Sequence, residues 1–290
     1  MFTGAMVALV TPFRGGKVDR GALEGLIEFQ IEGGIDAIIP CGTTGESATL
    51  SPEEHTKVVE WTVEAVNKRV PVIAGTGSNN TEEAIYYTRH AKEAGADGAL
   101  LITPYYNKPT QEGLYEHFAR IAKEVDIPMI LYNVPGRTGV NMMPDTVARL
   151  AKIDNIVGIK EATGSLAQVS ETIYKCPEDF VVLSGDDFTY WPILAVGGKG
   201  VISVTANISP FDMAALWDSF VKGDYEEARR RHYKLWPLHE AMFIETNPIP
   251  VKAALALMGK IDPEIRLPLT PMRGNNLEKL RSALKGYGLI

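Results

Sequence analysis

The 290-residue chain has only two cysteines, Cys41 and Cys176, which is too few for a disulfide framework and provides no CxxC motif. Such scarcity is typical of proteins that work in a reducing cytosol. No run of residues reaches the roughly 18 consecutive apolar side chains that a membrane-spanning helix requires. The first residues enter a strand-like pattern without the basic segment and long apolar run of a signal peptide. We therefore expect a soluble, cytoplasmic protein.

The chain also lacks an excess of basic residues. Lys and Arg number 29 against 36 Asp and Glu, which gives a net charge of −7. A protein of this sign is poorly suited to follow a phosphate backbone, and this argues against a nucleic-acid partner. Hydrophobic residues make up 45% and charged residues 22%, an ordinary globular composition. The 290 residues are enough for one large domain with a sizeable core or for two small ones.

Motifs for nucleotides and metals are missing as well. There is no P-loop and no complete GxGxxG, and Gly75-Thr76-Gly77 is too short to indicate a nucleotide site. The glycine-rich stretch 197–200 resembles a phosphate cradle, but it precedes a predicted strand, where a tight turn is expected. No HExxH motif occurs. All five histidines fall in predicted helices, namely His55, His90, His117, His232 and His239. We predict no metal and no organic cofactor.

Short apolar runs alternate with amphipathic helical patterns along most of the chain. The predicted strands are residues 6–10, 37–40, 72–74, 99–102, 129–132, 156–160, 181–184 and 201–204. A helical pattern follows each strand, with clear start signals such as Ser51-Pro52-Glu53-Glu54. Eight strand–helix units in about 220 residues favour a (β/α)8 TIM barrel over a doubly wound open sheet, which usually has fewer strands.

The remaining residues, 225–290, contain helical patterns at 225–243, 251–258 and 277–285. We interpret them as a C-terminal helical region that packs against the barrel. The expected organisation is therefore a catalytic barrel over residues 1–224, followed by a helical appendage over residues 225–290.

Lys160 ends the sixth predicted strand, whose preceding residues read as buried on both faces. Two interpretations are open. The lysine is either a cation that reaches solvent where the strand ends, or an amine held at the mouth of the barrel to attack a carbonyl and form a Schiff base. Because barrel active sites lie in the loops after the strands, the other loops decide between the two.

Hydroxyl groups dominate the loops after the other strands, which hold no histidine pair and no carboxylate cluster. The hydroxyl-bearing residues are Thr11, Thr43, Thr44, Tyr105, Tyr106, Tyr132 and Thr205. With a pKa near 10.4, only about 1 lysine in 2,500 is neutral at pH 7, but burial lowers that pKa. Hydroxyls can relay protons, and the amides of Gly42-Thr43-Thr44-Gly45 can form an anion nest. Each feature alone also reads as a turn or a strand end; their combination favours Schiff-base chemistry.

Eight segments resemble the motifs of a known family. They are residues 42–46 (GTTGE), 103–107 (TPYYN), 132–135 (YNVP), 135–139 (PGRTG), 158–161 (GIKE), 183–187 (LSGDD), 201–207 (VISVTAN) and 247–252 (NPIPVK). Over its whole length the chain resembles the pyruvate-dependent class I aldolases of the dihydrodipicolinate synthase and N-acetylneuraminate lyase family. The resemblance implies an enzyme without a cofactor that forms a homotetramer, built as a dimer of dimers.

The resemblance assigns catalytic roles to four residues. It implies that Lys160 forms an imine with pyruvate, and that Tyr132 and Thr43 relay protons to and from the reacting atoms. Tyr106 would complete this relay by reaching in from a neighbouring subunit.

Further residues would bind the two substrates. Thr44, together with Thr43, would hold the pyruvate carboxylate. Arg137 would bind the carboxylate of L-aspartate 4-semialdehyde, a task that suits a planar guanidinium. Gly185 and Ile202 would line the pocket with backbone groups. The implied reaction condenses pyruvate with the semialdehyde to 4-hydroxy-tetrahydrodipicolinate, in lysine and diaminopimelate biosynthesis.

Two other functions compete with this reaction. The first is another pyruvate-dependent aldolase, such as an N-acetylneuraminate lyase or a 2-keto-3-deoxy sugar acid aldolase. The Arg137 motif argues against it, because the sialic acid lyases lack that motif in this form. The second is a non-catalytic amino-acid or oxo-acid sensor. Such a protein would be free to lose Lys160, Tyr132 or Thr43, and all three are present.

Sensitive members of the family bind the inhibitor L-lysine at a dimer interface. The matching residues are Ser47, Ala48, His55, Asn79, Glu83 and Tyr105. Glu83 would pair with the ammonium group of the inhibitor; surface polarity and a helix cap are the alternative explanation. Pro52 departs from the pattern, because a lysine-sensitive member has histidine there. We expect feedback inhibition by lysine.

Overall fold

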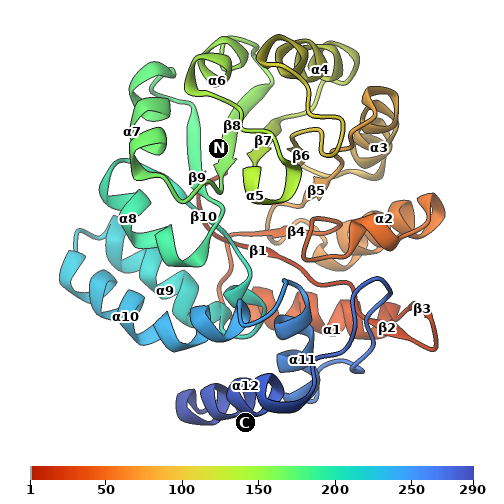
Figure 1. The fold of residues 1–290 in the computed structure, drawn as a ribbon, viewed down its shortest axis with the longest axis vertical. Helices are drawn as coiled ribbons and strands as arrows, with labels where there is room; N and C mark the ends of the chain where they lie inside the picture. The colour runs from red at the N-terminus through yellow and green to blue at the C-terminus, as the bar shows by residue number, and fades with distance from the viewer. Residues whose placement is uncertain (1) are drawn as a thin grey trace.

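Eight parallel strands form the centre of the computed structural model, which describes residues 2–290. The strands are β1 (Gly4–Ala8), β4 (Ala37–Ile39), β5 (Ile73–Gly75), β6 (Gly98–Ile102), β7 (Met129–Asn133), β8 (Ile156–Glu161), β9 (Val181–Ser184) and β10 (Gly200–Ser203). They pair in the order β4-β1-β10-β9-β8-β7-β6-β5, and a bridge between Ile38 and Val72 joins the two outer strands. Figure 1 shows this ring with helices around it. The predicted (β/α)8 barrel is confirmed.

The helices that follow these strands surround the barrel. They are α1 (Arg20–Glu32), α2 (Pro52–Val66), α3 (Thr81–Ala94), α4 (Gln111–Glu124), α6 (Pro144–Leu150), α7 (Leu166–Lys175), α8 (Tyr190–Ala195) and α9 (Pro210–Val221). Their start signals act as expected. Asp19 caps α1, and Ser51 and Glu54 form a reciprocal capping box on α2. In residues 2–290 no helix is both long enough and apolar enough to cross a membrane.

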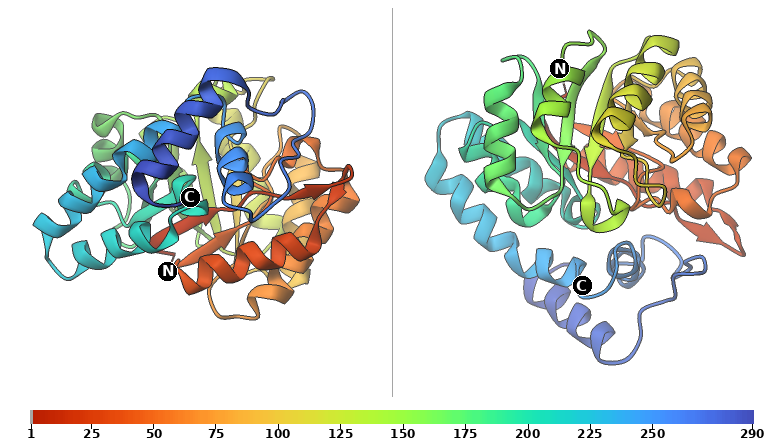
Figure 2. Two further views of the ribbon diagram at one scale, coloured as in Figure 1. Left: turned by 90° about the horizontal axis from the view of Figure 1, so that it is seen from below. Right: turned by 45° about the horizontal axis from the view of Figure 1, so that its top comes forward.

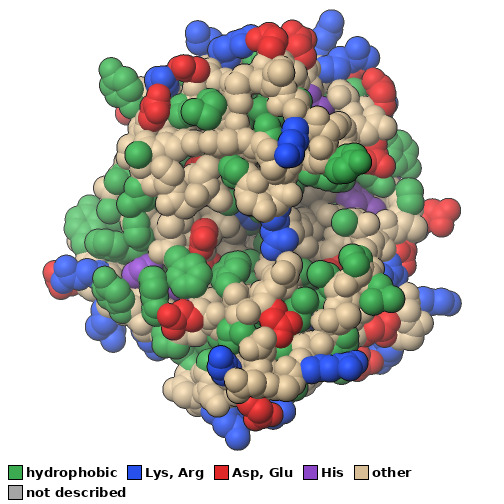
Figure 3. Space-filling view, viewed as in Figure 1, with side chains coloured by type: hydrophobic (Ala, Val, Ile, Leu, Met, Phe, Trp, Pro, Cys, Tyr) green, Lys and Arg blue, Asp and Glu red, His purple; other side chains and the backbone are tan. Residues whose placement is uncertain are grey.

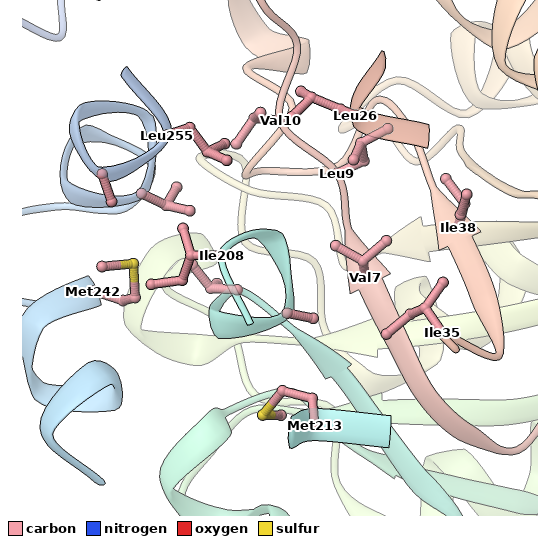
Figure 4. Packing of buried hydrophobic residues seen from close by; sticks show 14 of the residues in the cluster. Val7, Leu9, Val10, Leu26, Ile35, Ile38, Ile208, Met213, Met242 and Leu255 are labelled. Atoms are coloured by element: carbon pink, nitrogen blue, oxygen red, sulfur yellow. The ribbon is translucent and has the colours of Figure 1, made fainter. Parts of the chain in front are cut away.

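The strands are buried on both faces, so the core has an inner and an outer part. Residues such as Met6, Ile39, Ile130 and Leu183 fill the inside of the barrel. Their strand neighbours pack outward against the helices. Figure 4 shows the outer part where β1 meets the C-terminal helices, with Val7, Leu9, Leu26, Ile208, Met242 and Leu255 in one cluster. The same core therefore extends from the barrel into the C-terminal region.

Short elements in the loops after the strands have no counterpart in the sequence pattern. A hairpin joins β2 (Phe13–Arg14) to β3 (Lys17–Val18). Helix α5 (Pro135–Thr138) contains the arginine motif, and the short turns η1 (Ser47–Thr49), η2 (Asp187–Thr189) and η3 (Thr205–Asn207) lie after β4, β9 and β10. Elements of two to four residues are too short to show a hydrophobic period, which explains why they escape prediction.

Three helices form the C-terminal region: α10 (Tyr225–Met242), α11 (Ile249–Leu257) and α12 (Gly274–Tyr287). α10 packs along α9, and α11 contacts α12 and η3. The right view in Figure 2 shows α11 and α12 below the barrel, on the side where α5 lies. The region thus reaches the carboxyl ends of the strands. The boundary at residue 224 stays a prediction, since the hydrophobic core continues across it.

Candidate active site

A cavity of about 530 Å³ opens at the carboxyl ends of the strands. Most of its lining comes from the segments 41–55, 132–138 and 246–269, together with Gly75, Gly77, Glu83, Tyr87, Leu100, Ile102 and Tyr105. Figure 3 shows this face hollowed near its centre, between α5 and α2. The cavity therefore lies where the sequence predicts the site, at the loops after the strands, and its role as the active site stays a prediction.

Lys160 stands at the end of β8 and is 5% exposed. Its Nζ lies 4.3 Å from the ring centroid of Tyr132. No hydrogen bond or ion pair joins Nζ to any other residue in the described part of the chain. Burial lowers the pKa of Lys160 to about 8, a shift opposed by Asp187 and reinforced by Arg137. Because the side chain is buried, the interpretation of Lys160 as a solvent-exposed surface cation is wrong. With this pKa about one amine in ten is neutral at pH 7.

Tyr132 is fixed opposite Lys160 by the register of the barrel, since the two residues are partners on β7 and β8. Burial raises the pKa of the Tyr132 phenol, while the Arg137 charge and a hydrogen bond with the Thr43 side chain oppose the rise. The hydroxyl therefore keeps its proton at neutral pH. Thr43 lines the same cavity as Tyr132, and a protonated tyrosine beside a threonine hydroxyl can both give and accept a proton.

The residues next in sequence to this pair lie on the outer face of the strands. Asn133 and Glu161 are also register partners, and the Asn133 amide donates to the Glu161 carboxylate at 3.1 Å. The same amide donates to Asn141 Oδ1 at 2.8 Å. Asn133 therefore connects β7 and β8 with the end of the loop that contains Arg137.

The Gly42-Thr43-Thr44-Gly45 turn follows β4 and is tightly packed. A Cβ on Gly45 would lie 3.0 Å from Cys41 N and 3.1 Å from Leu9 O, so a larger residue would require the neighbouring backbone to shift. Thr11 Oγ1 donates to Gly45 O at 2.7 Å, and Asn247 Nδ2 donates to Thr44 Oγ1 at 2.9 Å. Because Thr44 accepts that bond, its own proton is free to point at a bound anion.

Arg137 lies on α5 and lines the cavity. Its Nη2 donates to the backbone oxygen of Asn247 at 3.1 Å. Its positive charge lowers the pKa of both Lys160 and Tyr132. The structure therefore places Thr43, Tyr132 and Arg137 in the lining of one cavity, with Lys160 against the Tyr132 ring and Thr44 next to Thr43 in the turn; their roles stay predictions.

Gly185 follows β9, which pairs with β8, and Ile202 lies on β10, the next strand in the barrel order. Gly185 directly follows β9, and its N–H donates to Glu161 O at 2.8 Å. A Cβ there would lie 2.6 Å from the Ala162 Cβ, so the backbone comes close to β8. Ile202 lies inside the barrel on β10, paired with Met6. Gly185 is therefore close to the end of the Lys160 strand, whereas Ile202 lies one strand further round the barrel.

Tyr106 is the one predicted catalytic residue that stands apart from the others. It is 89% exposed and does not line the cavity of its own chain. Its loop is held by two bonds, from Asn79 Nδ2 to Tyr105 O and from Asn107 Nδ2 to Asn79 O. In this single chain the Tyr106 hydroxyl does not take part in the site.

The residues matched to an inhibitor site share the cavity with Thr43, Tyr132 and Arg137. Ser47, Ala48, His55, Glu83 and Tyr105 all line it, and Asn79 contacts Tyr105. Surface polarity does not explain His55, because the ring is buried, bonds Gly75 O through Nε2 at 2.9 Å and packs 4.1 Å from Tyr87. Burial lowers the pKa of His55 to about 4, so this ring is neutral at pH 7.

Three residues of the surroundings were not singled out by the sequence: Glu46, Asn247 and Lys252. Lys252 Nζ donates to Glu46 Oε1 at 2.5 Å, and both side chains are buried. Both lie inside motifs of the family, 42–46 and 247–252, but motif membership alone does not reveal that they pair. Across residues 2–290 no group of three His, Cys, Asp or Glu side chains is arranged to hold a metal ion. The absence of a cofactor stays a prediction.

A buried amine without a partner, set over a tyrosine at the mouth of a (β/α)8 barrel, is typical of enzymes that form a Schiff base with a carbonyl substrate. The comparisons with known proteins agree with this class. Residues 1–287 match the model of the Dihydrodipicolinate synthetase family, and the chain belongs to that family.

Individual relatives cover the whole chain. A 4-hydroxy-tetrahydrodipicolinate synthase from Syntrophobacter fumaroxidans is 64% identical over 291 residues, covering 100% of both chains. The structure of a chloride-inhibited dihydrodipicolinate synthase from Acinetobacter baumannii, complexed with pyruvate, is 52% identical with a TM-score of 0.98 and covers 100% of both chains. That of the enzyme from Cyanidioschyzon merolae with lysine bound is 44% identical with a TM-score of 0.97, covering 100% of this chain and 99% of the other.

Proposed function

We propose that this chain is a 4-hydroxy-tetrahydrodipicolinate synthase, which condenses pyruvate with L-aspartate 4-semialdehyde. Full-length relatives with that name support the reaction. The observation that carries the chemistry is the buried Lys160 amine, which has no partner and whose pKa burial lowers to about 8. Such an amine is partly neutral at physiological pH and can attack a carbonyl carbon.

In the first half of the reaction, the Lys160 amine adds to the ketone carbon of pyruvate. The resulting carbinolamine loses water to give the imine, and a methyl proton then leaves to give the enamine. Tyr132 and Thr43 are suited to move these protons, because both line the cavity and the Tyr132 ring lies 4.3 Å from Lys160 Nζ. The Thr43–Thr44 turn would hold the pyruvate carboxylate through its hydroxyls and backbone amides.

In the second half, the enamine carbon attacks the aldehyde of the second substrate and forms the new C–C bond. Arg137 would bind the carboxylate of this substrate, with the backbone at Gly185 and Ile202 lining the pocket. The amine of the substrate then adds to the imine carbon and closes the ring. This transimination breaks the bond to Lys160 Nζ and returns the free amine.

Product formation tests this function against the alternative aldolases. Purified protein is supplied with pyruvate and either L-aspartate 4-semialdehyde or N-acetylmannosamine, and substrate loss is followed by NMR. We expect equal consumption of pyruvate and semialdehyde, and no reaction with the sugar aldehyde. Turnover with the sugar aldehyde alone would contradict the proposal.

We further propose that L-lysine inhibits the enzyme by binding near Ser47, Ala48, His55, Asn79, Glu83 and Tyr105. The lysine-bound relative supports this proposal. An inhibition curve with a Glu83→Gln variant tests it, with Glu82→Gln on the same turn of α3 as control. Loss of the Glu83 charge should raise the inhibitory concentration about tenfold, because an ammonium–carboxylate bond is lost. A flat curve through millimolar lysine for the unmodified protein would contradict the proposal.

We also propose a homotetramer, built as a dimer of dimers, in which Tyr106 enters the site of a neighbouring subunit. The exposure of Tyr106 supports this arrangement. Tyr106→Phe and Lys160→Met proteins, each weakly active or inactive, are refolded together to mix their subunits. Mixed dimers should regain activity, because one site then contains both native residues. No gain over the separate proteins would contradict the proposal.

A further inference from the structure

The turn that would hold the pyruvate carboxylate ends in an unusual backbone conformation. Glu46 has a φ of 54° and ψ of 35°, in the left-handed region that residues other than glycine rarely adopt. Cys41, just before the turn, also has a positive φ, of 56°. A turn of this shape persists only when its surroundings hold it in place.

The residues that hold this turn belong to the C-terminal region of the chain. Glu46 is buried, and both of its carboxylate oxygens accept hydrogen bonds. Lys252 Nζ donates to Oε1 at 2.5 Å, and Arg266 N donates to Oε2 at 3.1 Å. Lys252 also donates to Thr11 O at 2.9 Å, and Thr11 in turn donates to Gly45 O. The turn is therefore held on two sides by one buried lysine.

The same C-terminal segment reaches the two groups assigned to substrate carboxylates. Asn247, which precedes α11, donates through Nδ2 to Thr44 Oγ1 at 2.9 Å. Its backbone oxygen accepts from Arg137 Nη2 at 3.1 Å. Further along, the Arg266 guanidinium donates to Thr49 O at 2.8 Å and bonds Glu54 in the first turn of α2. Segment 247–266 thus bonds the turn at Thr44 and Glu46 and continues along the chain to α2.

We propose that Glu46 and Lys252 are positioning residues for the first substrate: their buried ion pair holds the Gly42–Glu46 turn so that Thr43 and Thr44 bind the carboxylate of a 2-oxo acid. This inference rests on the proposed function. It makes the C-terminal region part of the binding site, although that region provides none of the catalytic side chains.

A second polar cluster provides a matched control for a merely structural role. Asp212 on α9 is buried and accepts from Lys234 on α10 at 2.9 Å and from Tyr287 on α12 at 2.7 Å. It fastens the same C-terminal helices, but none of these three residues lines the cavity. A Tyr287→Phe variant therefore weakens the attachment of the region without touching the turn.

The test compares Lys252→Met, the double variant Glu46→Gln/Lys252→Met, and Tyr287→Phe in the full-length protein. Thermal unfolding reports stability, and initial rates give kcat and the KM for pyruvate. We expect the pyruvate KM of Lys252→Met to rise about tenfold with kcat changed by less than about threefold, since ground-state binding is what is lost. The double variant leaves no buried charge unpaired, so its Tm should recover while the pyruvate KM stays raised. Tyr287→Phe should keep the KM of the unmodified protein.

Several results would overturn the inference. A pyruvate KM within about twofold of the unmodified value in the double variant would do so, as would a KM that recovers together with Tm, since both indicate a role in stability alone. A Tyr287→Phe protein with an equal rise in KM would have the same meaning. If Lys252→Met does not fold, the double variant decides. Failure of the unmodified protein to react with pyruvate would instead overturn the proposed function, and this inference with it.

Discussion

Among residues 2–290, two lysines are buried, and a comparison of their surroundings explains why one of them is reactive. Lys252 is 2% exposed and Lys160 is 5% exposed. Each lies over an aromatic ring, at 4.1 Å from the centroid of Phe13 and 4.3 Å from that of Tyr132. They differ in polar partners: Lys252 bonds Glu46 and Thr11 O, whereas Lys160 bonds none of the described residues.

Burial acts on both amines, and the partner decides the outcome. Burial lowers the pKa of Lys252, but Glu46 opposes the shift through its charge and its hydrogen bond. Burial lowers the pKa of Lys160 to about 8, and the nearest opposing charges are the more distant Asp187 and Asp186. An ammonium in contact with a carboxylate is a structural cation, whereas a buried amine without a partner is a nucleophile.

Removal of the reactive amine should produce the largest effect. Lys160→Met should lower kcat/KM at least about 10⁴-fold, because the covalent route is closed. Its stability should stay equal or increase, since no partner is left with an unpaired charge. Initial rates and thermal unfolding on the same preparation check both parts. A marked fall in Tm would contradict the claim that Lys160 is unpaired.

The opposite outcome is expected for the structural lysine. Lys252→Met should lower the free energy of unfolding by about 3–5 kcal/mol, because Glu46 is left buried without its cation. The Glu46→Gln/Lys252→Met double variant should regain most of that loss. Urea denaturation gives the free energy of unfolding of the unmodified protein, of Lys252→Met and of the double variant. Equal stability of Lys252→Met and the unmodified protein would show that the pair contributes little.

Tyr132→Phe places the reactive lysine over the same kind of ring that Lys252 has in Phe13. The hydroxyl is lost but the packing is kept, so kcat should fall about 10²–10³-fold, as for loss of a general acid–base group. Stability should change little. Steady-state kinetics with both substrates checks the prediction, and a loss of less than about fivefold would remove Tyr132 from the proton relay.

The smallest predicted effect is a dependence of the rate of imine formation on pH. It should follow the titration of Lys160 and not that of the paired Lys252. Because the pKa of Lys160 is lowered to about 8, the neutral fraction of the amine should rise about tenfold from pH 7 to pH 9. The rate of imine formation with pyruvate should therefore rise with pH and level off above pH 9. Stopped-flow measurement under single-turnover conditions tests this, and a rate that is flat from pH 6.5 to pH 9 would contradict the pKa assigned to Lys160.

Most of the fold could be predicted because its signals are local. Strand β9 was placed at 181–184, as observed, and the caps at Asp19 and Ser51 marked the starts of α1 and α2. The hairpin at 13–18 and the short helix α5 could not be predicted. Such segments are too short to show a repeating hydrophobic pattern, and tertiary contacts determine their shape.

The site was predictable only in part, for a similar reason. Lys160 and Tyr132 can be identified from the sequence because each lies at the end of a barrel strand, and Thr43 because it follows one. The loops after all the strands lie at the same end of a (β/α)8 barrel, so these residues are expected to lie near one another. The Glu46–Lys252 pair could not be identified from the sequence, since its two residues are 206 positions apart in the chain. A glutamate or a lysine in a sequence does not indicate which residue it will pair with. Their proximity depends on how the C-terminal helices pack.

One measurement tests the difference between the two lysines most directly. The protein is reduced with borohydride in the presence of pyruvate and digested, and the peptides are mapped by mass. We predict a three-carbon adduct on Lys160 and none on Lys252, although the two are buried almost equally. An adduct on Lys252, or none on Lys160 in folded protein, would contradict the claim that pairing separates the structural from the reactive lysine.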